Sequence, residues 1–284
     1  MALNDASEPA ASISVRFWGV RGSIPCPGAN TARYGGNTSC VEIHCGDHIL
    51  IFDAGTGIRP LGEALAGVAP SADYDVFLSH CHIDHMVGLP FFAPLFAKDS
   101  VVRVWAGHLQ PACGVERAVR TLMSFPFFPL QVEALKATVE FRDFHAGDTI
   151  HPKPGVTLRT AALNHPGGAT GYRIEYGGQS VAYLTDVELG DGPLDPALLA
   201  LAKDAGLVIL DTTYTDAELP SHIGWGHSTW QQGVRLANAA GAGRLCLFHH
   251  DPDHDDTIMD TIKAAASAAR PGTIVASEGL QIGL

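Results

Sequence analysis

The chain has 284 residues and a formal net charge of −12 at pH 7, with 46% hydrophobic and 17% charged residues. This composition excludes an intrinsically disordered chain, because enough apolar side chains are present to form a core. The charge argues against a long nucleic acid as the main partner, because a phosphate backbone is bound by clustered Lys and Arg.

The strands expected from the sequence are short and are separated by turns or helices. In the first half they lie over residues 12–19, on both sides of the Gly46-Asp47 turn, over 75–80 and over 101–106. In the second half they lie over 156–164, on both sides of the Gly177-Gly178 turn in 171–186, and over 207–211, 244–250 and 273–277. Gly-Asp and Gly-Gly pairs between apolar runs are usual in tight hairpins.

Helices are expected between these strands. The first runs from Gly57 to about Leu65 and the second follows Gly114. The third begins after an Asp195 N-cap, with Pro196 in its first turn and Gly206 as its stop. Alternating strands and helices predict sheets that are covered by helices. We expect a flexible N-terminus over 1–12 and a single domain over 13–284.

Two more helices are expected towards the end of the chain. One begins after a Ser228 cap, with Gln231 at capping-box spacing, and ends at Gly241. The last begins near Asp256. The acidic run "DPDHDD" (251–256) would cap this last helix or lie behind a ligand site, because Asp favours helix starts.

Two apolar segments have more than one interpretation. The stretches "LPFFAPLFA" (89–97) and "FPFFPL" (125–130) could line an apolar pocket or a homodimer surface. Packing in the core is the alternative, and it is favoured for the first segment. The prolines of the second make it a poor interior helix or strand, so an exposed or capping position is favoured there.

Several features favour a cytoplasmic location. No apolar run of roughly 18 residues could span a membrane, and the first residues lack a basic start followed by an apolar stretch. The six cysteines are scattered without a C-x-x-C pair. This pattern is more typical of reduced thiols than of a disulfide framework.

The stretch "SHCHIDH" (79–85) places His80, His82, Asp84 and His85 within six positions at the end of an expected strand. Imidazole and carboxylate groups are suitable ligands for zinc and similar divalent ions. One ion rarely takes four ligands from six residues, whereas two neighbouring ions could share them. Histidines that only form hydrogen bonds in a loop are the alternative, which is weak for four such groups together.

Three later residues offer further ligands. His165, Asp186 and His249 each follow an expected strand. Taken singly, each has a structural alternative: a histidine in a turn, an aspartate at a strand end, or a partly buried histidine. Together with the first cluster they make seven candidate ligands, which is enough for two ions and a water.

Five motifs of the chain resemble those of the metallo-β-lactamase superfamily: "FDAGTG", "SHCHIDH", His165, "YLTD" and "LCLFHHD". The stretches "FWGVRGSIPCPG" and "GHST" are similar to the branch that contains ribonuclease Z and small phosphodiesterases. The resemblance implies an α+β fold, an αββα sandwich of two mixed sheets flanked by helices, with the site at one edge.

The resemblance also implies how the ligands divide between two ions. His80, His82 and His165 would bind one ion; Asp84, His85 and His249 would bind the other; and Asp186 would bridge both. His250 is the rival of His249, which the family pattern of a strand followed by a histidine favours. Asp53 would fix the ligand loop by hydrogen bonds rather than bind metal, or it would only cap a Gly-rich turn.

The expected activity is that of a metal-dependent hydrolase. Two divalent ions, Zn²⁺ or alternatively Mn²⁺, would supply a bridging hydroxide, and Asp84 is expected to be a catalytic residue as well as a ligand. His227 in "GHST" matches a proton-donating histidine of the phosphodiesterase branch, and a helix-start residue without a catalytic role is its alternative. The roles of His222, His250 and His254 stay open.

A small phosphodiester, for example a cyclic nucleotide, is the expected substrate. Residues 187–248 contain only Lys203, Arg235 and Arg244 as basic groups, which is poor for binding long RNA. Rival interpretations are a lactone, thioester or β-lactam hydrolase, a mononuclear iron dioxygenase, and a regulator that binds metal without catalysis.

Overall fold

The computed structural model describes residues 12–68 and 72–284. The expected flexible N-terminus over 1–12 therefore lies outside the described residues, apart from Ser12. Within the described ranges, no helix is both long and apolar enough to cross a membrane. All six cysteines are free thiols, as their scattered positions predicted.

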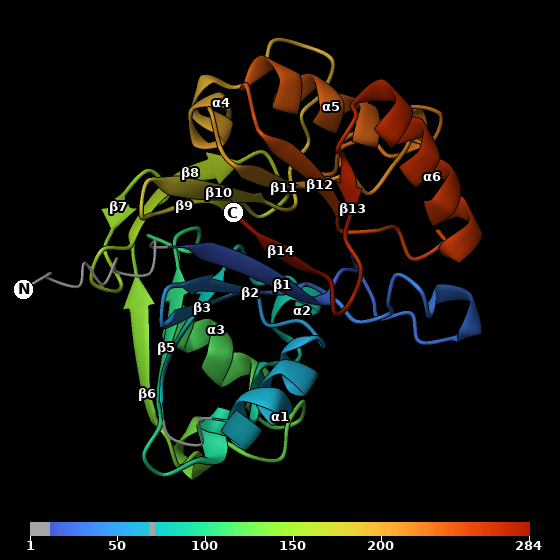
Figure 1. Cartoon of the computed structure of the whole chain (residues 1–284). Helices are drawn as coiled ribbons and strands as arrows, with labels where there is room; N and C mark the ends of the chain where they lie inside the picture. The colour runs from blue at the N-terminus through green and yellow to red at the C-terminus, as the bar shows by residue number, and fades with distance from the viewer. Residues whose placement is uncertain (1–11, 69–71) are drawn as a thin grey trace, which may run out of the picture.

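Two seven-stranded sheets lie face to face (Figure 1). The first sheet has the order β14 (Gln281–Gly283), β1 (Ile13–Gly19), β2 (Cys40–Cys45), β3 (His48–Phe52), β4 (Asp73–Leu78), β5 (Val101–Ala106) and β6 (Thr138–Asp143). The second has the order β13 (Ile274–Val275), β12 (Arg244–Phe248), β11 (Leu207–Asp211), β10 (Gln179–Leu184), β9 (Ala169–Tyr176), β8 (Thr157–Leu163) and β7 (Thr149–Ile150).

Helices cover the outer faces of the two sheets (Figure 1). The α-helices are α1 (Ile58–Val68), α2 (Ile83–Met86), α3 (Val115–Leu122), α4 (Pro196–Ala202), α5 (Trp230–Ala239) and α6 (Asp256–Ala269). Short 3-10 helices are η1 (Ala29–Thr31), η2 (Leu89–Phe91), η3 (Ala93–Phe96), η4 (Val132–Ala134) and η5 (Leu219–Ser221). Helices α4, α5 and α6 lie over the second sheet, and α1 and α3 over the first.

Aromatic side chains fill the space between the sheets. Phe52 contacts Phe77 and Tyr172 with ring centroids 5.3 Å apart in each pair, and it contacts Tyr183 at 5.6 Å. All four rings are fully buried, which stabilises the sandwich by roughly 1.5–3 kcal/mol for each such side chain. Apolar clusters on the two outer faces join each sheet to its helices. The expected α+β sandwich with helices outside is confirmed.

The first helix boundary to correct is that of α5. Its N-cap is Thr229, which forms a capping box with Gln232, rather than Ser228 with Gln231. The reason is that the Ser228 hydroxyl is already used elsewhere, because it donates to the Val187 carbonyl and accepts from Leu189 N at 3.1 Å. The register of the cap therefore depends on a long-range contact that no local pattern contains.

Other boundaries differ less. The Asp195 cap and Pro196 of α4 are confirmed, but the helix ends at Ala202 and not at Gly206. The strands β6, β7 and β14 were not predicted, since they are short or carry charged residues at a sheet edge. Strand β14 follows β13, the predicted last strand, in the chain. It pairs with β1 in the first sheet, whereas β13 lies in the second.

The two apolar segments, 89–97 and 125–130, lie where the favoured interpretations placed them. In 89–97, Leu89, Phe92 and Leu95 are buried under the first sheet. In 125–130, Phe125 and Phe127 are 89% and 75% exposed. The first segment therefore belongs mainly to the core, and the second lies at the surface.

Candidate metal centre

The candidate ligands come from strand ends that meet at one edge of the sandwich. Strands β3 and β4 run parallel in the first sheet, and β10, β11 and β12 run parallel in the second. Within each sheet, the carboxyl ends of these strands therefore point in one direction. Asp53, Asp186 and His249 directly follow or nearly follow such strands, and each has a positive φ of 57–61°. This strained conformation turns the chain sharply at the strand end, as is common at functional sites.

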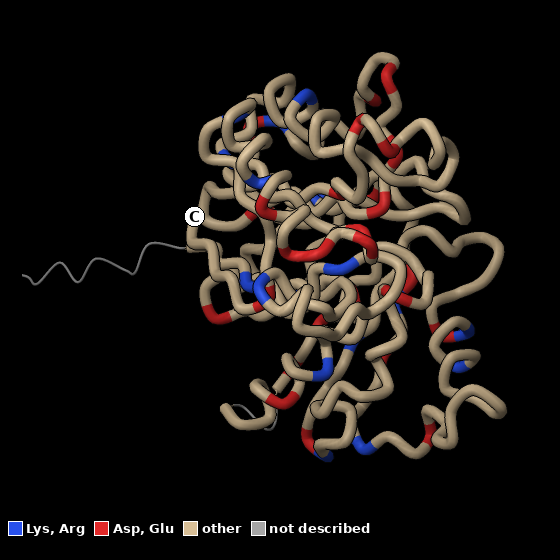
Figure 2. Tube along the Cα trace, turned by 90° about the vertical axis from the view of Figure 1, so that its right-hand side faces the viewer, with Lys and Arg blue, Asp and Glu red and all other residues tan. Residues whose placement is uncertain are grey.

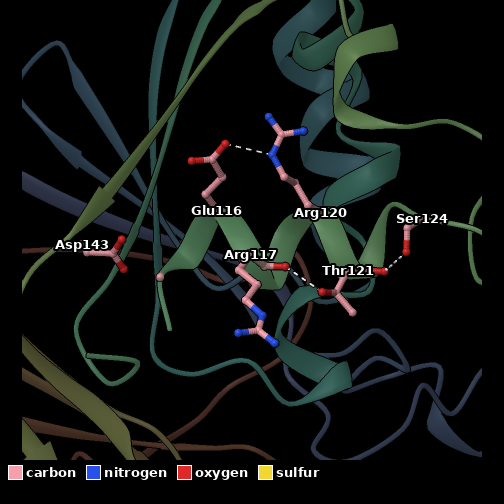
Figure 3. A pocket seen from close by; sticks show the side chains of 7 residues that line it. Glu116, Arg117, Arg120, Thr121, Ser124 and Asp143 are labelled. Carbon is pink, nitrogen blue, oxygen red and sulfur yellow. Dashed lines mark hydrogen bonds and ion pairs between the residues drawn. The ribbon is translucent and has the colours of Figure 1, made fainter. Parts of the chain in front are cut away.

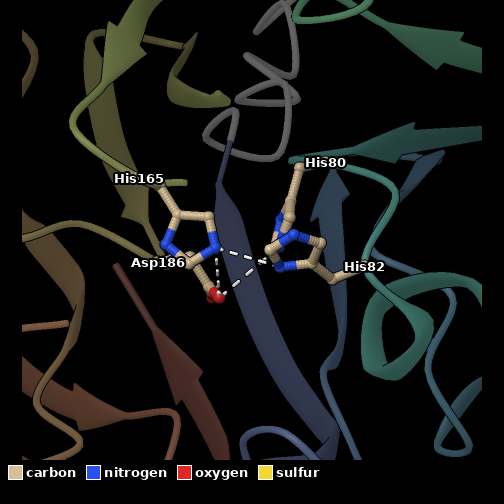
Figure 4. Close-up of side chains that lie close together, drawn as sticks. All are labelled: His80, His82, His165 and Asp186. Atoms are coloured by element: carbon tan, nitrogen blue, oxygen red, sulfur yellow. Dashed lines mark hydrogen bonds and ion pairs between the residues drawn. The ribbon is translucent and has the colours of Figure 1, made fainter. Parts of the chain in front are cut away.

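The first set of candidate ligands comprises His80, His82, His165 and Asp186, shown in Figure 4. One ligand atom from each lies within 4.8 Å of the others. His165 Nε2 is 3.1 Å from His82 Nδ1, and Asp186 Oδ2 is 3.6 Å from the Nε2 atoms of His80 and His165. Three of the four side chains are buried and His82 is exposed, so the set opens to solvent at His82.

The second set comprises Asp84, His85 and His249. His249 Nε2 lies 3.2 Å from His85 Nε2 and 3.3 Å from Asp84 Oδ2. Asp186 joins the two sets, because its Oδ1 is 3.2 Å from the Nε2 atoms of His85 and His249 while its Oδ2 faces the first set. The structure thus brings together all seven residues that the sequence suggested as ligands.

The chemistry of these side chains fits divalent cations. His85 Nδ1 donates to Asp53 at 2.9 Å, His165 Nδ1 donates to the Gly226 carbonyl at 3.0 Å, and His249 Nδ1 lies 3.1 Å from the Thr213 hydroxyl. Such partners on one ring nitrogen leave the other free to bind a metal. His80 Nε2 is buried with no hydrogen-bond partner, although its Nδ1 lies 3.0 Å from Ser79 Oγ. A buried unpaired nitrogen beside a carboxylate is an unsatisfied site that a cation would fill.

The charge states of the histidines in the first set, and of Asp84 and Asp186, also fit a metal site. Burial lowers the pKa of each histidine in the first set below the ordinary imidazole value, so the rings are neutral at pH 7, the form that binds metal. Burial alone would raise the pKa of Asp84, but His85 and His249 hold it well below its usual range. Burial likewise opposes the ionised form of Asp186, and the histidines around it keep its pKa low.

Asp53 lies behind the second set and does not face its ligand atoms. Its carboxylate accepts hydrogen bonds from Ser79 N at 2.7 Å, Ser79 Oγ at 2.8 Å and Tyr183 OH at 2.7 Å, in addition to His85. These contacts join the second sheet to the loop that carries four candidate ligands. The geometry matches a residue that fixes the ligand loop, and none of these four donors belongs to the Gly-rich turn after β3.

His227 lies against both sets. Its ring centroid is 5.3 Å from that of His165 and 5.0 Å from that of His249. Its Nδ1 donates to Asp211 Oδ2 at 2.8 Å. Burial by itself lowers the pKa of His227, but the Asp211 carboxylate outweighs this effect and raises the pKa to about 9.

Asp211 and Thr213 are residues that the sequence reasoning missed. Asp211 accepts from His227, from Val187 N and from the Thr213 hydroxyl, which in turn contacts His249. The available signal was the position of Asp211 at the end of the apolar strand "LVILD", like that of Asp186 after "SVAYLT". Sequence alone did not show that this aspartate faces the same edge.

The N-terminal Arg-Gly-Ser segment was also missed as part of the site. The Ser23 N–H donates to Asp84 Oδ2 at 2.7 Å. A Cβ on Gly22 would lie 2.4 Å from the His249 ring, so only glycine allows this close approach. Arg21 is fully buried and donates to the carbonyls of Asp251 and His254 at 2.9 and 2.6 Å. The segment therefore contacts both Asp84 and His249 and helps to hold the second set of ligands in place.

The remaining histidines of this region face other partners. His250 Nε2 donates to the Ala276 carbonyl at 2.8 Å, so it turns away and leaves His249 in the second set. His254 pairs with Glu218 at 2.9 Å, and His222 stacks on Tyr214 with a centroid distance of 4.3 Å. Within the acidic run, Asp255 caps α6 by accepting from two backbone N–H groups.

A separate hollow of about 510 Å³ lies along α3 (Figure 3). Its lining includes Glu116, Arg117, Arg120 and Asp143 and none of the seven candidate ligands. Arg120 is already paired with Glu116 at 2.8 Å, and Asp143 accepts from the first backbone N–H of α3. These internal pairings make the hollow a weaker candidate than the cluster at the sandwich edge.

Comparisons with known proteins agree with this geometry. Residues 48–250 match a family described as a beta-lactamase superfamily domain. Ribonuclease Z of Myxococcus xanthus is 24% identical over 294 residues, covering 87% of this chain and 92% of the relative. A diphosphatase of the PhnP family superposes with a TM-score of 0.67 at 17% identity, covering 96% of this chain and 97% of that one. Zn²⁺-bound PqqB of Methylobacterium extorquens superposes with a TM-score of 0.69 at 19% identity, covering 95% and 100%. The family match spans most of the chain and contains all seven candidate ligands, so the chain belongs to the metallo-β-lactamase superfamily.

Proposed function

We propose that the protein is a dinuclear metal-dependent hydrolase that cleaves a small phosphodiester. The observation that carries the proposal is the position of Asp186, whose two carboxylate oxygens face two different sets of ligand atoms. A single ion would not require a carboxylate between two such sets. The name of the Myxococcus relative, a ribonuclease, supports a phosphodiester bond as the target.

The first ion would be held by His80, His82 and His165, the second by Asp84, His85 and His249, and Asp186 would contact both. Zinc is the ion that we propose, because imidazole and carboxylate ligands suit it and PqqB is a zinc-bound neighbour. When bound, such ions activate water as a nucleophile and offset negative charge on phosphoryl oxygens.

The chain's own groups would place the substrate and the protons. His227 Nδ1 is held by Asp211, so Nε2 is the nitrogen that can carry a proton towards the leaving oxygen. The buried Asp211 carboxylate favours the protonated ring, which is the form a general acid needs. His82, the exposed member of the first set, marks the side from which a substrate enters.

A small substrate is favoured by the charge of the surrounding loops. Residues 79–97, 164–168, 186–195, 211–230 and 249–256 carry or flank the candidate ligands and contain no Lys or Arg. Figure 2 shows basic positions scattered along the trace without a continuous band. A phosphate backbone is normally bound by such a band, whereas one phosphodiester has a single negative charge that metal ions can neutralise. We therefore propose a small diester, such as a cyclic nucleotide, rather than long RNA.

The test combines metal analysis with a substrate screen. Protein purified without chelator should contain close to two divalent ions per chain by elemental analysis. The zinc- and manganese-loaded forms should then be assayed on bis-p-nitrophenyl phosphate, cyclic nucleotides, an RNA precursor, a lactone and a β-lactam. Turnover of the diesters is expected, and Asp84→Ala should abolish it while the exposed control Asp99→Ala retains it.

Four results would contradict the proposal. A reproducible content of one ion, unchanged by added zinc or manganese, would exclude the dinuclear centre. One iron per chain with oxygen consumption would indicate the dioxygenase instead. Turnover of the lactone or β-lactam alone would indicate that the same ligands serve a different hydrolase activity. Cleavage of RNA alone would exclude the small substrate.

A further inference from the structure

Glu188 joins three segments of the metal centre. It lies two residues after Asp186, and its carboxylate accepts hydrogen bonds from the N–H groups of Gly224 and Gly226. One oxygen, Oε2, is 2.9 Å from both nitrogens. The Glu188 backbone is paired with Asn164, from Glu188 N to Asn164 O at 2.9 Å and from Asn164 Nδ2 to Glu188 O at 3.0 Å. Glu188 is thus tied both to the residue before His165 and to the loop before His227.

The loop that Glu188 holds is in direct contact with His165. The Gly226 carbonyl accepts from His165 Nδ1 at 3.0 Å. Gly226 has a φ of +88°, and a Cβ at this position would lie 2.2 Å from His165 Nδ1. The carbonyl can therefore reach the ring only because the backbone passes unusually close to it, and small movements of the loop would break the bond.

Little apolar packing keeps this part of the loop in place. Ile223 and Trp225, on either side of Gly224, are 71% and 59% exposed. The backbone is instead held by polar contacts: Glu188 binds its N–H groups, and Ser228 pairs with the backbone of Val187 and Leu189. The segment 187–189 thus acts as a clamp on the loop 224–228.

We infer that the Glu188 carboxylate is a positioning residue for the first metal site. It holds Gly226 so that the carbonyl fixes the proton of His165 on Nδ1 and directs Nε2 to the ion, and the same contact places His227. Partners of ligating histidines typically contribute 10–100-fold to metal affinity. The inference rests on the proposed dinuclear centre, and it assigns the carboxylate to backbone N–H groups rather than to metal.

The experiment compares Glu188→Ala with Glu188→Gln and Glu218→Ala. Glutamine presents an oxygen that can accept from both N–H groups, as Oε2 does, and so should preserve the clamp. Glu218 is a matched control in the segment that precedes this loop, since its carboxylate accepts from Thr215 and pairs with His254 but does not contact Gly224 or Gly226. Zinc affinity at each of the two sites is measured by competition with a chromophoric chelator.

Glu188→Ala should lower the affinity of one ion by roughly 10–100-fold and leave the other within about twofold. Glu188→Gln and Glu218→Ala should match the wild type. NMR of zinc-loaded protein with labelled histidine should show the His165 Nδ1–H resonance in the wild type and in Glu188→Gln, and its loss or fast exchange in Glu188→Ala.

An unchanged affinity and resonance in Glu188→Ala would overturn the inference, and so would a loss in Glu188→Gln as large as that in Glu188→Ala, because charge would then matter instead of the hydrogen bonds. If Glu188→Ala does not fold, Glu188→Asp, whose side chain is one methylene shorter, replaces it with the same expected loss. A wild type that binds fewer than two ions would instead refute the dinuclear centre, so the two failures are distinguishable.

Discussion

Replacing Asp53 with alanine tests whether the hydrogen bonds of this carboxylate stabilise the fold and the metal centre. Asp53 is fully buried and accepts four hydrogen bonds, from Ser79 N, Ser79 Oγ, Tyr183 OH and His85 Nδ1. The Ser79 hydroxyl can rotate towards His80, so three donors would lose their partner. At about 1 kcal/mol for each buried unpaired donor, the low end of the usual range, the loss is roughly 3 kcal/mol.

The backbone adds a second cost. Asp53 has a φ of 61°, where an alanine is less favourable than Asp or Asn by about 1–2 kcal/mol. Release of a buried carboxylate from its desolvation offsets part of the total. We therefore expect Asp53→Ala to lower the free energy of unfolding by roughly 3 kcal/mol, which is a large fraction of the stability of a typical domain. Asparagine tolerates the positive φ at this position and keeps one acceptor oxygen. The loss of unfolding free energy in Asp53→Asn should therefore be about half as large.

The assay is urea unfolding of chelator-treated protein, followed by circular dichroism, so that bound metal does not contribute to the stability. Zinc affinity of the folded variants is measured separately and should fall by roughly 10–100-fold, because His85 loses the partner that directs its Nε2. The exposed Asp99→Ala is the control. An Asp53→Ala protein within about 0.5 kcal/mol of the wild type would refute the reasoning, because the four hydrogen bonds would then make no net contribution.

Three further predictions follow from particular contacts. Asp186→Asn, which tolerates the positive φ, should bind fewer than two zinc ions by elemental analysis while its circular dichroism spectrum is unchanged; two tightly bound ions would contradict the bridging role. His227→Ala should lose ~10²–10⁴-fold in kcat on a cyclic nucleotide but far less on bis-p-nitrophenyl phosphate at equal metal occupancy, because p-nitrophenolate leaves without a proton; equal losses would indicate a positioning role. Burial alone would raise the pKa of Glu42, but hydrogen bonds from His44 and Trp18 lower it. Its stabilisation is therefore present above about pH 4.3 and is lost as the pH falls through the folded pKa. The difference in unfolding free energy between wild type and Glu42→Gln should close on acidification, and a constant difference would count against this.

The sequence by itself determined the elements and the chemical groups of the site. Apolar runs bounded by Gly pairs specified the hairpins β2–β3 and β9–β10, because a tight turn and its flanking strands are contiguous in the chain. The seven candidate ligands were identifiable because each lies at or just after the end of an apolar strand, and imidazole and carboxylate groups at such ends are chemically distinctive. The alternation of strands and helices implied covered sheets, and the family resemblance implied their arrangement.

Only the tertiary structure decided which groups face one another. The Asp211–His227 and Thr213–His249 contacts, and the donation of Ser23 N to Asp84, join segments 16 to 61 residues apart, and they depend on how the loops at the strand ends of one sheet pack together. The choice of His249 over His250 followed from the positive φ at His249, which turns one ring inward and the other towards Ala276. The role of Glu188 was hidden for a further reason: its partners are backbone N–H groups, which every non-proline residue carries. A sequence reveals side-chain chemistry and local propensity, whereas the partner of a backbone group is set by the approach of distant segments once the core has packed.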